Sequence, residues 1–252
     1  PTDQPDEEPE VEEPLIESSP IPNNPQRTGN ASVGYEYLIS GNYMSSGVPY
    51  DAFLLGTSVN PDNRLNRIGD NANLPYDYTA ITATNGAKVV APNCMACHAS
   101  TINNEFIIGL GSHDADFTVN RASNIALLNS GIRALYGGEE SAEWQAYDQF
   151  RKSIVAIGPR TITETRGSNP ADKITLVLIA HRDKSTLEWQ DTPLVDIPEE
   201  VIPSDVPAWW LLKKKNAMFY HAIGRGDFCK SFIGSSLLTL GDATKAAEID
   251  AK

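Results

Sequence analysis

The spacing of apolar side chains along the chain predicts a domain built mainly from helices. In the segment 120–136, apolar residues recur at every third or fourth position, which predicts a helix, and Asn120 is its expected N-cap. Segment 140–156 repeats this period with large aromatic side chains. Further helical segments are predicted at 208–222, 228–240 and 243–250.

Short apolar runs between turn residues predict a few small strands. Segment 80–91 contains two such runs, split by the turn signal Asn85-Gly86. A strand is expected at 105–110, whereas 175–180 fits either a strand or a helix. Long loops are expected at 60–77 and 183–206. The predicted fold class is therefore mainly α, with long loops and a few short strands.

Charge divides the chain into two parts. Of its 252 residues 33 are acidic and 20 basic, which gives a net charge of −13. Residues 1–27 are rich in Pro, Glu and Asp, and we expect a disordered or extended tether there. The folded domain is expected at 32–252. Its mild acidity argues against nucleic-acid binding, which needs a basic face.

One basic cluster, Lys213-Lys214-Lys215, stands out in this acidic chain. It fits either a solvated helix edge or a patch that steers an acidic redox partner. No apolar run approaches the roughly 18 residues that a membrane helix needs. The only membrane link we expect is a lipid anchor at the N-terminus, although no anchoring cysteine is in the sequence.

The segment Asn93-Cys94-Met95-Ala96-Cys97-His98 contains the pattern C-x-x-C-H. Two cysteines one helical turn apart can each form a thioether with a vinyl group of one porphyrin, and the next residue can bind its iron. A CxxC pair also occurs in zinc sites and redox dithiols. A zinc site needs a second pair of ligands at close spacing, and a redox dithiol is typical of a βαβ unit. The sequence shows neither feature. We therefore predict one covalent haem c.

The second axial ligand of that iron is open on the sequence alone. The candidates are Met44, His113, His181, Met218 and His221. We expect His113 and His181 at the surface. Met218 and His221 are three residues apart and would share one face of a helix. Core packing for the methionine, and a surface or hydrogen-bonded role for the histidine, remain alternatives.

Other residues are given supporting roles. Trp209 and Trp210 are expected either near the porphyrin edge or as packing residues. Arg225 is expected to pair with a haem propionate or with Asp227. The third cysteine, Cys229, is expected to be a buried free thiol.

Several segments resemble a family of large bacterial c-type cytochromes, related to the dihaem cytochrome c peroxidases and to rubber-oxygenase-like dihaem proteins. The resemblance covers about 34–245 and is most specific at 206–227. The segments are Gly41-Asn42-Tyr43, Ser46-Gly47-Val48-Pro49-Tyr50-Asp51, Asn93 to His98, Ile108-Gly109-Leu110-Gly111 and Asp205-Val206-Pro207-Ala208-Trp209-Trp210-Leu211-Leu212-Lys213-Lys214-Lys215-Asn216-Ala217-Met218-Phe219-Tyr220.

The resemblance implies a cytochrome c-like haem domain in which the block after Val206 packs on the distal face of the haem. It raises Met218 as distal ligand, with His221 second. Family members normally continue into a second domain with another CxxCH, which this sequence lacks. This difference weakens any transfer of peroxidase activity, which depends on two haems.

The expected function is one-electron transfer outside the cytoplasm, in the periplasm or extracellular space, by a c-type cytochrome for which an N-terminal lipid anchor is the expected link to a membrane. Its expected partners are redox proteins and other haem subunits. The alternatives are a peroxidase-like or oxygenase-like enzyme domain of a longer dihaem protein, and a relay subunit of a larger assembly. Whether the chain is an enzyme stays open.

Overall fold

The structure is a computed structural model that describes residues 18–57, 63–204, 206–219, 222, 224–239 and 241–251. The first elements are α1 (Ala31–Ser40), β1 (Val48–Pro49), α2 (Tyr50–Gly56), η1 (Gly69–Asn73), β2 (Tyr78–Thr82) and β3 (Lys88–Pro92). The middle of the chain forms α3 (Met95–His98), β4 (Ala99–Ile102), β5 (Glu105–Ile108), α4 (Ile125–Tyr136), α5 (Ala142–Ile157) and η2 (Gly158–Arg160). The last elements are α6 (Ala171–Ala180), η3 (Trp209–Lys214), α7 (Phe228–Thr239) and α8 (Ala243–Asp250).

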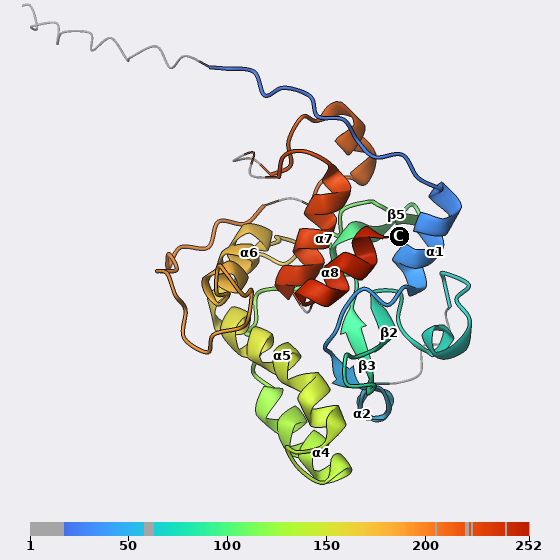
Figure 1. Ribbon diagram of the computed structural model, residues 1–252, viewed down its shortest axis with the longest axis vertical. Helices are drawn as coiled ribbons and strands as arrows, with labels where there is room; N and C mark the ends of the chain where they lie inside the picture. Colours follow the sequence, from blue (N-terminus) through green and yellow to red (C-terminus); the bar gives the residue numbers. More distant parts are fainter. Residues whose placement is uncertain are drawn as a thin grey trace, which may run out of the picture.

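Helices make up most of the regular structure and the strands are short, as predicted (Figure 1). The predicted hairpin in 80–91 is confirmed as β2 and β3, joined by a turn in which Gly86 takes a φ of 87°. The strand at 105–110 is confirmed as β5, paired with β4. The ambiguous segment 175–180 is helical and lies in α6.

β3 is the central strand of an antiparallel sheet with the order β1-β3-β2. Alternate side chains of a strand point to opposite faces, and both faces of β3 are buried. Val89 and Ala91 join one apolar cluster with Met44, whereas Val90 joins another with Tyr147 of α5. The sheet is therefore covered on both sides, with α5 packed along β1 and β3.

The helices from α4 onwards pack in chain order. α5 lies against α4 and α6, α6 reaches α7, and α7 lies beside α8 (Figure 1). The turn between α4 and α5 follows local sequence chemistry: Gly137 ends α4 in the left-handed conformation, and Ser141 caps α5 by accepting a hydrogen bond from the Trp144 N–H.

The predicted helix over 208–222 is wrong. Among the described residues of that range only η3 is helical, and Phe219 and Ala222 have φ values of 64° and 57°. The Met218 N–H donates to the Gly224 carbonyl over 2.7 Å, so this part of the chain is a reversing loop. Non-glycine residues with positive φ cannot continue a right-handed helix.

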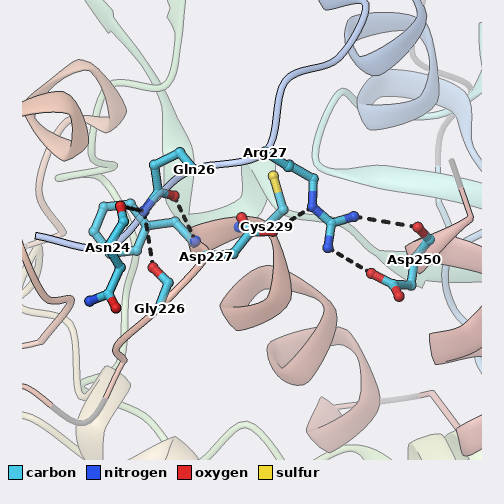
Figure 2. A network of polar contacts seen from close by, with 8 residues as sticks. Asn24, Gln26, Arg27, Gly226, Asp227, Cys229 and Asp250 are labelled. Carbon is cyan, nitrogen blue, oxygen red and sulfur yellow. Dashed lines mark hydrogen bonds and ion pairs between the residues drawn. The ribbon is translucent and has the colours of Figure 1, made fainter.

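The end of the predicted N-terminal tether contacts the C-terminal helices (Figure 2). Arg27 forms ion pairs with Asp227 at 2.5 Å and with Asp250 at 2.7 Å. Gln26 donates to the Gly226 carbonyl and accepts from the Phe228 N–H. Residues 1–17 of that predicted tether lie outside the described part of the chain.

This network predicts a pH dependence. The Arg27 guanidinium holds the pKa of the Asp227 carboxyl below its usual range. A lowered carboxyl pKa contributes stability above the unfolded value of about 3.9, and the contribution is lost as the pH falls through the lower folded value. In Arg27→Met, a carboxyl-carbon NMR titration is expected to show a higher pKa for Asp227. An unchanged pKa would contradict the pairing.

Candidate haem site

The CxxCH segment folds as the predicted single helical turn. Cys94 has helical backbone angles, and the His98 N–H donates to the Cys94 carbonyl over 3.0 Å. The buried Asn93 side chain fixes the start of this turn. Its Oδ1 accepts from the Met95 N–H, and its Nδ2 donates to the Tyr76 carbonyl, both over 2.9 Å. The sequence pattern alone assigned no role to Asn93.

Replacing Asn93 with alanine is expected to lower the free energy of unfolding by about 2 kcal/mol, because a buried carbonyl and N–H lose their partners. The matched control is Asn42→Ala, which removes one bond to the Thr82 N–H from an exposed side chain. Urea unfolding of both variants measures the difference. Equal losses in the two variants would contradict this role.

The two thiols of the motif have different surroundings. Cys94 packs between the cluster of Tyr43 and Met44 and a second cluster that contains Met95. Burial raises the pKa of Cys94 to about 11. The Sγ atom of Cys97 lies 3.6 Å from Nδ2 of Asn169, which donates to it, and burial also raises the pKa of this thiol.

These thiols differ from a reactive redox dithiol, whose attacking cysteine has a lowered pKa. Within the described ranges, no three His, Cys, Asp or Glu side chains gather around one point where a metal ion could be held. Cys94, Cys97 and His98 are therefore not arranged as ligands of a single ion. A covalent haem needs no such convergence, because its thioethers form at the porphyrin edge.

The His98 ring packs against Trp209. Their ring centroids are 4.9 Å apart, with 30° between the planes. Burial lowers the pKa of His98 to about 4, so the imidazole is neutral at pH 7, and the neutral form is the one that binds iron. Nδ1 of His98 and Nε1 of Trp209 are buried without a hydrogen-bond partner among the described residues.

Backbone hydrogen bonds join three distant segments at this point. The Gly109 N–H donates to the His98 carbonyl over 2.7 Å, and the Ser112 N–H donates to the Cys97 carbonyl over 2.8 Å. The Trp209 N–H in turn donates to the Gly109 carbonyl over 2.8 Å. The segment 108–112 thus bridges the CxxCH motif and the block that begins at Val206.

Two glycines make this approach possible. Gly109 has a φ of 87°, and a Cβ there would lie 3.3 Å from the Trp209 ring. A Cβ on Gly111 would overlap the carbonyl oxygen of Val206. The glycines in Ile108-Gly109-Leu110-Gly111 therefore allow the backbone of 206–209 to lie directly against the segment that follows the motif.

The structure brings Trp209 to the predicted site but leaves the distal ligand untested. Met218 is half-buried in the reversing loop, and the described contacts join it to Gly224 rather than to His98. His221 lies outside the described residues. Met218 belongs to none of the described helices, and the expectation that it shares a helix face with His221 concerns a residue outside the described part of the chain.

The structure also corrects or restricts the roles expected for Trp210, Arg225 and Cys229. Trp210 is exposed, whereas Trp209 carries the contact to the motif. Arg225 donates to the Ala222 carbonyl over 3.0 Å, and Asp227 pairs with Arg27 instead of with Arg225. Cys229 is a free thiol, but it is exposed rather than buried.

The remaining ligand candidates differ in burial. His113 is exposed, as expected. His181 is buried, contrary to the expectation, because its ring stacks on Trp189 at 4.7 Å and its Nδ1 pairs with the Gln190 carbonyl. His181 follows the last residue of α6, whose ten residues span about 15 Å. Asn169, which touches Cys97, lies just before the other end of α6, so His181 is far from the motif.

Asn169 is the site residue that the sequence did not reveal. It is buried, and its backbone pairs with Ser204 in both directions, which directs the segment before Val206 towards Cys97. No local pattern marks an asparagine in the stretch Ser168-Asn169-Pro170 as a neighbour of a cysteine 72 positions earlier.

Within the described residues, no helix is long and apolar enough to cross a membrane. A scan against protein-family models, a search of curated proteins and a search of solved structures each find no match.

Proposed function

We propose that this chain is a c-type cytochrome domain that carries one haem on Cys94 and Cys97, with His98 as proximal ligand, and that it transfers single electrons. The observation that carries the proposal is the CxxCH turn, with a neutral imidazole held against Trp209. The iron of a bound haem would supply the one-electron couple. The protein would supply two thioether attachments, one axial nitrogen and a buried environment.

The arrangement around the motif supports this proposal. The segments that resemble the cytochrome family meet there: Tyr43 lies in the cluster that packs on Cys94, and the segments around Gly109 and Trp209 are hydrogen-bonded to the motif and to each other. Covalent haem attachment to CxxCH takes place outside the cytoplasm, which favours the periplasm or the extracellular space. Redox proteins and other haem subunits are the partners that fit this chemistry.

Expression with a c-type maturation system tests haem attachment. The intact protein is expected to gain the mass of one haem, and its pyridine haemochrome spectrum is expected to show two saturated vinyl groups. The double variant Cys94→Ser/Cys97→Ser should lose both signals. The matched control, Cys229→Ser, removes the exposed third cysteine and should retain them. A mature chain without added mass would refute the proposal.

We propose Met218 as the distal ligand and His221 as the second choice. Met218→Ala is then expected to remove the far-red charge-transfer band of a methionine-bound ferric haem, while His221→Ala leaves it. Loss of the low-spin state in His221→Ala alone would reverse this choice. A high-spin ferric signal in the unmodified protein, with turnover of peroxide or oxygen, would favour the alternative of a peroxidase-like or oxygenase-like enzyme domain.

A further inference from the structure

The three lysines that follow Trp209 form a surface without a neutralising partner. The basic patch consists of Lys213, Lys214 and Lys215, all exposed at the end of η3. Within the described residues, no carboxylate lies within ion-pair distance of the patch. Three other lysines are paired: Lys88 with Asp70, Lys152 with Asp148 and Asp191, and Lys245 with Glu248. Lys184 and Lys230 are single exposed lysines, so the patch differs from them in gathering three unpaired charges at consecutive positions.

The N-terminal segment is held next to this patch. The Asn216 side-chain Nδ2 donates to the carbonyl of Ile21 over 2.8 Å, immediately after Lys215. Gln26 and Arg27 fasten the following residues to Gly226 and Asp227 (Figure 2). In Figure 1 the blue N-terminal segment accordingly passes beside the orange segment that carries η3. The chain before Ile21 therefore starts at the basic patch.

The residues that precede this anchor are strongly acidic. Residues 1–17 contain eight acidic side chains and no basic one. Glu17 is four residues before Ile21, so it reaches up to about 14 Å from that anchor. Lys213 is three residues before Asn216, which places its Cα within about 11 Å of it. The nearest carboxylates and the lysines can thus meet without any change in the described structure.

We propose that the acidic N-terminal residues 1–17 bind the basic patch of the same molecule. Opposite charges within about 10 Å attract each other in 0.1 M salt, and attachment at Ile21 gives the acidic segment an effective concentration on the order of millimolar at the lysines. An acidic partner protein would have to displace this segment. That last consequence rests on the proposed function, because the patch lies on the element whose Trp209 touches His98.

Zero-length carbodiimide coupling tests the contact in the full chain. The reagent joins a carboxylate to a lysine amine only where the two touch, and peptide mass spectrometry identifies the pairs. At low salt, Glu17 and the other acids of residues 1–17 are expected to couple to the basic patch about tenfold more than to Lys184 and Lys230, which are also exposed and unpaired. This preference is expected to disappear in about 0.5 M salt.

Two controls distinguish binding of the patch by residues 1–17 of the same molecule from binding by a second copy of the chain and from non-specific coupling. A mixture of unlabelled and ¹⁵N-labelled protein is expected to give coupled peptides of one isotope only; mixed pairs would assign the patch to a second copy and overturn the proposal. The triple variant Lys213→Gln/Lys214→Gln/Lys215→Gln should lose the coupling, whereas Lys184→Gln/Lys230→Gln should retain it. Coupling spread evenly over all exposed lysines, or none at all, would refute the contact. Neither result bears on haem attachment.

Discussion

Replacing Arg67 with methionine is expected to lower the free energy of unfolding by about 3–5 kcal/mol. Arg67 is only 4% exposed, and its guanidinium donates to four backbone carbonyls. Three of these bonds, to Leu74, Pro75 and Tyr78, are 2.6–2.8 Å long. The variant leaves these carbonyls without donors inside the protein, so hydrogen bonds no longer offset the free-energy cost of removing the carbonyls from water.

Urea unfolding measures this loss as a lower midpoint at unchanged slope. Arg67→Lys is not expected to restore stability, because one ammonium cannot reproduce the planar fork of the guanidinium. The matched control is Arg225→Met, which changes an exposed arginine and is expected to alter stability by no more than about 0.5 kcal/mol. A loss below about 1 kcal/mol in Arg67→Met would show that water replaces the guanidinium.

Replacing Gly111 with alanine is expected to destabilise the protein by about 3 kcal/mol. The new Cβ would overlap the carbonyl oxygen of Val206, and backbone atoms cannot move aside as a flexible side chain can. The segment from Val206 to Trp209 must therefore shift away from the motif. The same variant is expected to change the near-ultraviolet circular dichroism of Trp209 and, if the chain carries the proposed haem, to lower the haem yield.

Gly131→Ala is the matched control for this substitution. Gly131 lies on the exposed side of α4, and a Cβ there would meet no atom within 4 Å. Alanine is the better helix former, so this variant is expected to gain about 0.5–1 kcal/mol. If Gly111→Ala behaved like Gly131→Ala, the close contact between 108–111 and 206–209 would be wrong.

Local sequence signals predicted the parts of the fold that depend on local interactions. The Asn85-Gly86 turn, the helical turn of CxxCH and the periodic segment that became α5 each follow from residues close together in the chain. The helix over 208–222 failed because its apolar and basic residues fit helical spacing, while positive φ at Phe219 and Ala222 is a backbone property that composition does not reveal.

Long-range pairing decided the other failures. Asp227 is one of the two partners that the sequence suggests for Arg225, but Arg27, 200 residues away, binds it instead. His181 was expected at the surface because charged residues follow it, yet Trp189 returns through a loop and covers its ring. Two contacts of the site cannot be derived from residue spacing: the one between Asn169 and Cys97, and the one between Trp209 and His98. Both depend on how distant segments of the chain fold back onto the motif.

The distance along the chain between the motif and Trp209 has a consequence for biogenesis. Asn169 contacts the Cys97 thiol and Trp209 packs on the His98 ring, and both residues follow the motif by many tens of positions. A chain that emerges N-terminus first presents Cys94, Cys97 and His98 before either of these two residues has emerged. If the chain carries the proposed haem, the attachment is therefore easiest before the C-terminal third folds onto the motif, and a maturation enzyme would compete with folding for access to the thiols.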